Sequence, residues 1–474
     1  MISPTPSFLK DVKKALQNER LQTALSNLPQ GLVAQRNAAI TQLPNFENLR
    51  EKAQLIRDHT LAHLDHYLEL FADKAEEAGA KVHWASEGAE ACSIVENICR
   101  SKKASLVVKG KSMVSEEINL NSYLKAKGIE VVETDLGEYI VQKRNERPSH
   151  IIAPAIHLTQ SDIESDFRGY HDGYPQDRTL GTPESLVQEA RSILRKKFLS
   201  ADIGITGANF LIAETGSAMI VTNEGNGDLC LALPPIHIVI TSIEKVVPTL
   251  NDASLLLRLL TRSATGQDIT AYTTLTTGIR GEEDRNGPRE YHVILLDNGR
   301  TKMLKGPLRE VLRCIRCGAC MNVCPVYNAI GGHAYGSVYP GPIGSVLTPS
   351  LFGIQQSTDL VAASTLCGRC EEVCPVKIPI TSILRYWRRE AKNMIGATLK
   401  HQSFYSLWSF IARRPSLYHS LTSFISKSIY NFKKFKILHL LPIGRGWQKH
   451  RELPTPTGQT FQKLWKKRAN GEHL

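Results

Sequence analysis

The feature that most constrains this chain is the spacing of its cysteines. Seven of its ten cysteines lie between residues 314 and 374, in two runs that each end in Cys-Pro. The first run is Cys314, Cys317, Cys320 and Cys324, and the second is Cys367, Cys370 and Cys374. A chain of 474 residues can bury a large core of its own, and ten cysteines are too few for a disulfide-stapled scaffold. The spacing therefore predicts that these seven thiols are metal ligands.

The first run has the C-x2-C-x2-C-x3-C-P spacing of a bacterial [4Fe–4S] site, in which the fourth cysteine serves the other cluster of a pair. The spacing thus predicts two iron–sulfur clusters with crossed connectivity. The predicted ligand sets are Cys314, Cys317, Cys320 and Cys374 for one cluster, and Cys324, Cys367 and Cys370 for the other. A structural zinc site is the alternative, but such sites usually take four ligands in two pairs, which seven cysteines in two runs fit poorly.

The second cluster lacks a fourth thiolate. A complete second run would place a cysteine three residues before Cys367, where the chain has Ser364. Three alternatives stay open: a [4Fe–4S] cluster with Ser364 as its oxygen ligand, the same cluster with water or another oxygen, or a [3Fe–4S] cluster. The expected cofactors are two [4Fe–4S] clusters, with this uncertainty confined to the second.

Positive charge is concentrated at the end of the chain. The formal net charge of the whole chain is +12, and residues 385–474 hold 18 Lys and Arg against 3 Asp and Glu. Interleaved aromatic and cationic residues suit an anionic membrane face or an acidic redox partner. The alternative is a helix that packs its aromatics inward and solvates its cations. Nucleic-acid binding is not expected, because no module for it is recognisable.

The rest of the composition is ordinary for a globular protein, with 42% hydrophobic and 22% charged residues. No stretch reaches the roughly 18 consecutive apolar residues of a spanning helix, and the N-terminus lacks the apolar core of a signal peptide. We therefore expect a cytoplasmic protein, with residues 385–474 providing any contact with the inner face of the membrane.

Hydrophobic patterns divide the chain into four parts. Residues 1–78 are expected to be helical, because leucines recur there at three- and four-residue steps. Residues 79–300 alternate apolar strands, among them HIIAPA (150–155), with helices, which predicts an α/β domain with a largely parallel sheet. Residues 303–384 form a small α-helical, ferredoxin-type two-cluster domain, in which residues 325–366 are expected to be mostly loop with a short helix. Residues 385–474 form the helical basic C-terminal region.

Gly- and Ser-rich turns follow the apolar strands of the α/β part, where open parallel sheets tend to bind ligands. Glu214 and Glu224 are the carboxylates expected to face such a crevice, and glutamate chemistry of the CoA-transferase kind is one use for them. Turn and capping roles are the alternative. Lys109 and Lys111 are candidates for holding an anion, with a solvated loop as the alternative. No GxGxxG or GxxxxGK[ST] motif is present, so the usual NAD, FAD and ATP sites are not expected.

The chain resembles the lactate utilization protein B (LutB) family over nearly its full length. The resemblance is carried by VVKGKSMVSEEI (107–118) and ANFLIAETGSAMIVTNEGN (208–226), which look like the LUD domain. It is also carried by CIRCGACMNVCPVY, STLCGRCEEVCPVKIPI and the closing PTPTGQTFQKLWKKR. Members of the family have Ser where Ser364 stands, so seven cysteine ligands are the set that the resemblance implies.

The resemblance implies a LUD domain similar in fold to the NagB/RpiA/CoA-transferase group. It also implies an iron–sulfur electron carrier that acts with LutA-like and LutC-like subunits in the oxidation of L-lactate to pyruvate, without a substrate active site of its own. A different class of function stays open, in which the LUD domain is itself an enzyme and the clusters are its electron sink. A redox or iron sensor that binds nucleic acid is a third class, and no motif supports it.

Overall fold

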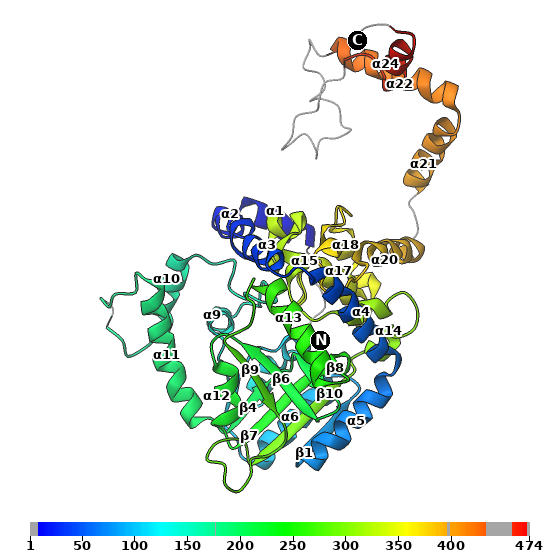
Figure 1. Ribbon diagram of the computed structural model, residues 1–474. Coiled ribbons are helices and arrows are strands. Elements are labelled where there is room, and N and C mark those ends of the chain that lie inside the picture. Colours follow the sequence, from blue (N-terminus) through cyan, green and yellow to red (C-terminus); the bar gives the residue numbers. More distant parts are fainter. Residues whose placement is uncertain (1–7, 176, 396–398, 433–456, 472–474) are drawn as a thin grey trace. The chain divides into compact units, whose positions relative to one another are not determined.

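The computed structural model describes residues 8–175, 177–395, 399–432 and 457–471. By its internal contacts the chain divides into two compact units, residues Met1–Ala391 and Lys392–Leu474. The first unit contains a six-stranded sheet, a four-stranded sheet and the cysteine-rich region (Figure 1). The described part of the second unit is helical.

The six-stranded sheet is parallel throughout, in the order β1-β10-β7-β4-β2-β3. Its strands are β1 (Ala80–Ala85), β2 (Leu106–Lys109), β3 (Glu130–Glu133), β4 (Ile203–Thr206), β7 (Ile236–Ser242) and β10 (Glu290–Leu296). The central strand β7 is buried along its whole length, as expected where helices cover both faces of a parallel sheet. Ile238 and Val239 accordingly belong to different core clusters, one on each face. The predicted α/β fold with a largely parallel sheet is confirmed.

Helices cover both faces of this sheet. One face packs against α6 (Gly88–Ser101), α7 (Met113–Glu117) and α8 (Leu120–Ala126). The other face packs against α5 (Leu64–Glu77) and against a layer that includes α9 (Leu136–Lys143), α10 (Gln160–Tyr170) and α11 (Pro183–Ser200). Cys92 and Cys99 of α6 are buried among apolar side chains in the first of these cores, where they pack as small hydrophobic residues.

The smaller sheet has the order β8-β5-β6-β9. Its strands are β5 (Phe210–Ile212), β6 (Ser217–Thr222), β8 (Val246–Val247) and β9 (Tyr272–Thr276), and α12 (Asn226–Ala232) and α13 (Leu250–Ala264) follow β6 and β8 in the chain. The turn between β5 and β6 presses against α5. Gly216 has φ +66° there, and a Cβ at this position would lie 2.4 Å from the backbone nitrogen of Ala75. Glycine is therefore required for the sheet to approach the helix.

Residues 150–155 are not a strand, so that prediction is wrong. The imidazole Nδ1 of His150 accepts hydrogen bonds from the backbone nitrogens of Ile152 and Ala153, both at 3.0 Å, which curls the segment into bends and turns. Its Nε2 donates to Oδ1 of Asn322 at 2.8 Å. The segment therefore connects the α/β part to the cysteine-rich region instead of joining the sheet.

The cysteine-rich region is more helical than predicted. Residues 325–366 contain α16 (Pro325–Ile330), α17 (Gly341–Phe352) and α18 (Thr358–Ala362), so the expectation of mostly loop is wrong. Its glycines serve close packing: a Cβ at Gly344 would lie 1.5 Å from the backbone oxygen of Tyr339. Two short helices that follow cysteine loops, α15 (Ala319–Asn322) and α19 (Arg369–Glu372), complete the region together with α20 (Ile380–Ile395).

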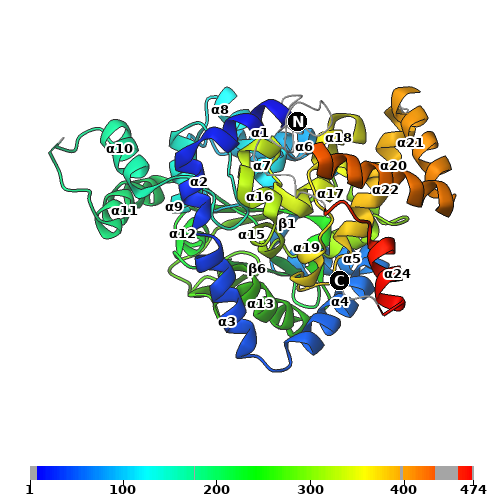
Figure 2. The same cartoon turned by 90° about the horizontal axis from the view of Figure 1, so that it is seen from above.

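The first helices of the chain cover this region. They are α1 (Phe8–Gln17), α2 (Glu19–Ser26), α3 (Ala34–Thr41) and α4 (Phe46–Ala62). Phe8 and Leu25 share a core cluster with Ile330 and Tyr335, and α1 and α2 lie beside α16 (Figure 2). The N-terminal helical segment is thus part of the core that surrounds the cysteines.

The boundary expected at residue 385 falls inside α20. Trp387 of this helix is buried and donates from Nε1 to the backbone oxygen of Val346 at 3.0 Å. Arg388 donates to the backbone oxygen of Val361 at 3.0 Å. Helix α20 therefore packs with the cysteine-rich region, and the compact unit ends at Ala391.

The second unit contains α21 (Leu399–Ala412), α22 (Pro415–Phe432) and α24 (Phe461–Ala469). Several of its aromatic side chains are more than half exposed, among them Phe404, Tyr405, Trp408, Phe424 and Trp465. In the part of the chain that the structure describes, no helix is both long and apolar enough to cross a membrane.

Candidate functional site

The two cysteine loops have the same backbone conformation. Arg316 and Gly318, which flank Cys317, have φ values of +59° and +73°. Leu366 and Gly368, which flank Cys367, have φ values of +55° and +85°. Left-handed backbone at non-glycine residues is uncommon and persists where the surrounding structure imposes it. Each loop runs into a short helix, so the two motifs are two copies of one structural device.

Four thiols gather at one place, although one of them comes from the second motif. Cys314, Cys317, Cys320 and Cys374 line a single small hollow together with Ile151, Arg316 and Ile343. Cys324, Cys367 and Cys370 are absent from that lining. We call these four residues the four-thiol set.

The remaining three cysteines form a second group, the three-thiol set. Burial raises the pKa of the Cys370 thiol to about 12, with further contributions from nearby Cys324, Glu371 and Cys367. Cys324 is also buried, and this burial raises the pKa of its thiol, with a smaller contribution from nearby Cys367. Cys367 itself is exposed, so this set reaches the surface of the protein.

Ser364 occupies the place in the second loop that Cys314 has in the first. The backbone nitrogen of Arg316 donates to Sγ of Cys314 at 3.4 Å. In the same way, the nitrogen of Leu366 donates to Oγ of Ser364 at 3.1 Å. The serine hydroxyl thus replaces a thiol at an equivalent position of the same loop.

The surroundings of the four-thiol set fit an iron–sulfur cluster. Burial raises the pKa of Cys317 to about 12 and that of Cys374 to about 11, so these thiols ionise only with a compensating cation such as iron. Thiolates are soft donors suited to iron–sulfur chemistry. The backbone nitrogen of Ile378 donates to Sγ of Cys374 at 3.4 Å, a type of contact that tunes cluster potential.

A large cavity lies at the carboxyl ends of the parallel strands. Its volume is about 410 Å³. It is lined by Gly110 and Lys111 after β2, Asp135 after β3, Gly207 after β4 and Lys245 after β7, and by Val221 and Thr222 of β6. Ile151 and Arg316 line both this cavity and the hollow of the four-thiol set. The cavity and the four thiols are therefore neighbours.

The two glutamates expected at the crevice have different positions. Glu224 lines the cavity, and its carboxylate accepts a hydrogen bond from the nitrogen of Leu136 at 3.0 Å. Burial of this carboxylate and the charge of Asp135 raise its pKa to about 7. Glu214 does not line the cavity. Its Oε1 instead accepts from the nitrogen of Leu250 at 2.5 Å, at the start of α13.

The two candidate lysines also differ. Lys109 is fully buried, and its Nζ lies 2.7 Å from Glu133 and 3.2 Å from Glu116. It therefore neutralises buried carboxylates instead of facing the cavity. Lys111 lines the cavity but donates to the backbone oxygen of Ile152 at 2.6 Å.

Sequence reasoning missed Lys245 and Arg316. Lys245 lies on the turn η2 (Ile243–Lys245) and is 6% exposed. Arg316 stands inside the first cysteine motif, where its Nη2 contacts Glu244 at 3.2 Å. They are 71 residues apart in the chain, and no motif connects them. Only the fold shows that both line the same cavity.

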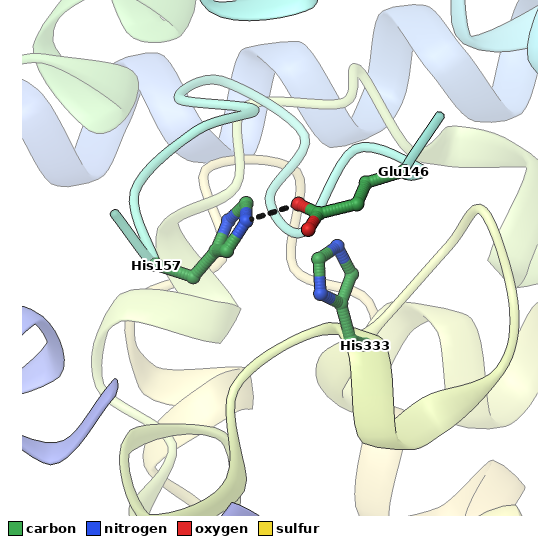
Figure 3. A group of neighbouring side chains, drawn as sticks. All are labelled: Glu146, His157 and His333. Atoms are coloured by element: carbon green, nitrogen blue, oxygen red, sulfur yellow. Dashed lines mark hydrogen bonds and ion pairs between the residues drawn. The ribbon is translucent and has the colours of Figure 1, made fainter. Parts of the chain in front are cut away.

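A second group that the sequence did not indicate is Glu146, His157 and His333 (Figure 3). Nε2 of His157 lies 2.8 Å from Glu146, and Nε2 of His333 donates to the backbone oxygen of Arg147 at 2.6 Å. One ligand atom from each of the three residues lies within 4.8 Å of the others. Arg144 also pairs with Glu146 at 3.0 Å. The group joins the loop after α9 to the cysteine-rich region.

Comparison with known protein families divides the chain in the same order. Residues 68–296 match the LUD domain, residues 310–378 match a 4Fe-4S dicluster domain, and residues 391–470 match the C-terminal domain of lactate utilisation protein B. The dicluster match shows that the cysteine-rich region binds iron–sulfur cofactors.

Curated relatives match over the whole chain. Lactate utilization protein B of Shouchella clausii is 42% identical, covering 100% of this chain and 99% of that protein. The protein of the same name from Bacillus subtilis is 41% identical, covering 99% and 98%. The match to a crystal structure of a DUF162 family protein from Deinococcus radiodurans covers 49% of this chain and 98% of that chain, at 15% identity and a TM-score of 0.27. The full-length identity and the three matching domains place the chain in the lactate utilization protein B family.

Proposed function

We propose that this protein is the iron–sulfur electron-transfer subunit of a complex that oxidises L-lactate to pyruvate during lactate utilization. The observation that carries the proposal is the division of seven thiols into two neighbouring sets. One set lies beside the LUD cavity, and the other reaches the surface at Cys367. The names of the relatives supply the lactate context.

We assign the ligands of the two clusters from this grouping. The first cluster takes Cys314, Cys317, Cys320 and Cys374, and the second takes Cys324, Cys367 and Cys370. The shared lining of the four-thiol hollow supports the crossed assignment of Cys374. When bound, [4Fe–4S] clusters supply one-electron carriers whose potential depends on charge, sulfur hydrogen bonds and solvent exposure.

Ser364 is the proposed fourth ligand position of the second cluster. Its Oγ accepts a backbone hydrogen bond just as Sγ of Cys314 does in the first loop, and the flanking left-handed residues match. A weakly bound water at this corner and a [3Fe–4S] form are the competing assignments. Ser364→Ala separates serine from water, because it should make the fourth iron easier to lose only if Ser364 is its ligand.

The two cysteine sets differ in their surroundings and in their exposure to solvent. Arg36 of α3 donates to the backbone oxygen of Val373 at 2.9 Å, and Arg50 of α4 donates to that of Cys374 at 2.8 Å, so the N-terminal helices hold the end of the second motif in place. Ile151 and Ile343 line the hollow of the four-thiol set, and three of its four cysteines are buried. Cys367 is exposed, so a partner subunit reaches the three-thiol set most directly.

The proposed partners are LutA-like and LutC-like subunits. Residues 385–474 hold 18 basic and 3 acidic residues, and several aromatic side chains of the described part of this region are exposed, which suits binding to an acidic redox partner or to the inner face of an anionic membrane. We propose a cytoplasmic location, with any membrane contact made through this surface. No role in nucleic-acid binding is proposed.

The test is lactate-dependent reduction of the clusters, followed by electron paramagnetic resonance under anaerobic conditions. In the proposed function, L-lactate reduces the clusters only when the partner subunits are present. Reduction by lactate with the purified protein alone would instead favour a self-contained LUD-domain enzyme, for which the large cavity beside the four-thiol set is the supporting observation. If L-lactate reduces the clusters neither in the protein alone nor in the presence of the partner subunits, both functions are contradicted.

A further inference from the structure

We infer that the cavity of the LUD domain is a binding site for a small organic carboxylate, anchored by Lys245 and Arg316. This inference goes beyond the proposed function, in which the chain needs no ligand of its own other than its clusters. It rests on four features of the cavity: an unpaired buried cation, a second cation beside it, apolar walls, and carboxylates that oppose a second negative charge.

Lys245 is the first feature. The residue is 6% exposed and lines the cavity, and its ammonium makes no hydrogen bond or ion pair within the described ranges 8–175, 177–395, 399–432 and 457–471. Burial and the nearby charge of Arg316 lower the pKa of Lys245 to about 7, because the ammonium loses hydration without gaining hydrogen bonds. An anion in the cavity would supply the missing acceptor.

Arg316 is the second feature. Its Nη2 lies 3.2 Å from Glu244, and its guanidinium lies over the ring of Tyr339, 4.8 Å from the ring centroid. These contacts orient the side chain, whereas Nη1 is buried without a partner in the described part of the chain. Glu244 is already paired with Arg300 at 2.8 Å. Arg300 also pairs with Glu117, so two carboxylates balance the two arginines, and Lys245 remains as an additional cation at the cavity.

The walls indicate the size and polarity of the ligand. The volume of about 410 Å³ falls within the range of about 300–1,000 Å³ that is common for small-molecule sites. Met113, Val221 and Leu260 provide apolar wall, and Thr222 provides a buried hydroxyl that lacks a partner among the described residues. The cavity thus suits a compact organic molecule with one anionic group and a second polar group.

The remaining charges favour a monoanion. Asp135 and Glu224 line the same cavity. Glu224, with a pKa raised to about 7, is only partly ionised at neutral pH, and each further negative charge on a ligand would add repulsion from these two side chains. A polyphosphate or a nucleotide is therefore a poorer fit than a single carboxylate. The position at the carboxyl ends of β2, β3 and β4 is where open parallel sheets bind their ligands.

The experiment is isothermal titration of the full-length, cluster-loaded protein with pyruvate, L-lactate and inorganic phosphate as separate probes. We expect saturable binding of at least one carboxylate. Lys245→Met should raise its Kd at least roughly tenfold, because a hydrogen bond to a charged group is lost. Lys74→Met is the matched control: Lys74 is exposed and pairs with Glu77, so its loss should leave Kd unchanged.

Iron content and resonance spectra of Lys245→Met are the second readout, and we expect both to match the wild type. Met113→Trp, which fills the cavity without changing charge, should also abolish binding, and it keeps the test decisive if Lys245→Met does not fold. Lack of carboxylate binding to the wild type, or binding of phosphate only, would overturn the proposal. So would loss of iron from Lys245→Met with carboxylate affinity retained, since the cation would then serve the cluster. Because binding is measured without turnover or partners, failure here is distinguishable from failure of lactate-dependent reduction.

Discussion

Arg300 and Glu117 form a two-point ion pair in the interior of the protein, with Nη1–Oε1 at 2.9 Å and Nη2–Oε2 at 2.7 Å, and both side chains are fully buried. The hydroxyl of Tyr339 donates to Oε2 of the same glutamate at 2.6 Å. Glu117 and Arg300 flank the LUD sheet, whereas Tyr339 belongs to the cysteine-rich region. The pair therefore connects the two regions through a single buried carboxylate.

Glu117→Gln should destabilise the protein strongly. The amide leaves Arg300 as a buried charge with only Glu244 as its acidic partner, and breaking a buried ion pair costs about 3–5 kcal/mol. The free energy of unfolding, from urea titration, checks this. Glu77→Gln, which removes an exposed pair with Lys74, is the control and should change stability by less than about 0.5 kcal/mol. A loss below about 1 kcal/mol in Glu117→Gln would show that the pair is not needed for the connection between the regions.

Cys374→Ser and Cys370→Ser test the crossed ligand assignment. Cys374 lines the hollow with three cysteines of the first motif, so its loss should damage the first cluster although it lies in the second motif. Cys370→Ser should damage the second cluster and spare the first. Iron counting and low-temperature resonance spectra report which signal is lost. If Cys374→Ser spares the first cluster, the crossed assignment is wrong.

Ser364→Cys tests the fourth ligand of the second cluster. Its Oγ holds the position that Sγ of Cys314 holds in the equivalent loop, so a thiol there should ligate iron. In the wild type, mild oxidation should first produce a [3Fe–4S] signal, because iron held by oxygen is bound more weakly than iron held by thiolate. The variant should suppress this signal. Thr365→Cys, one residue out of register, is the control and should leave the signal in place.

His237 should make the protein less stable in acid. It is fully buried on β7, its Nε2 lies 2.8 Å from Oγ1 of Thr206, and burial lowers its pKa to about 3. The unfolded chain has a histidine pKa of about 6.5, so unfolding takes up a proton between pH 6.5 and pH 3. Stability should therefore fall by about 1.4 kcal/mol per pH unit in that interval from this residue alone.

The check is a comparison of unfolding free energies at pH 6 and pH 4.5 for the wild type and for His237→Gln. The glutamine can keep a hydrogen bond to Thr206 but does not titrate. The free energy of unfolding of the variant should fall less steeply with decreasing pH than that of the wild type, by the slope that uptake of about one proton causes. This difference in slope is expected even if the variant is less stable at neutral pH. Equal slopes would mean that His237 takes up no extra proton on unfolding.

Removal of residues 392–474 should leave both clusters in place. The truncation point lies near the end of α20, after Trp387, which is part of the core, and all seven cysteines precede it. Docking to anionic vesicles or partner subunits should weaken, because most of the excess positive charge is removed. Co-sedimentation of the full chain should also fall steeply as salt rises. Association that is independent of salt and of truncation would contradict electrostatic docking.

Sequence patterns predicted the parts of the structure that depend on neighbouring residues. The alternation of apolar strands and helices predicted the parallel sheet, since side-chain periodicity directly reflects the local conformation. The spacing of Cys314, Cys317 and Cys320 predicted a compact metal-binding loop, because three thiols two residues apart meet within one turn of chain. Local patterns gave a wrong prediction at residues 150–155. There the ring of His150 accepts hydrogen bonds from the backbone nitrogens of Ile152 and Ala153. Asn322, which is far away in the sequence, holds the same ring from its other side.

By itself, then, the sequence determined the secondary structure of the LUD sheet, the iron–sulfur chemistry of the cysteine-rich region and the uneven charge of the chain. The spacing also predicted that Cys374 joins the first motif and that Ser364 stands where a cysteine would complete the second, and the structure brings these residues to the expected positions. The tertiary structure alone decided that Lys245 and Arg316 meet at one cavity and that this cavity adjoins the four-thiol set. Contacts of this kind bring together residues far apart in the chain. They are set by how whole helices and strands pack, and such packing leaves no periodic signal in the sequence.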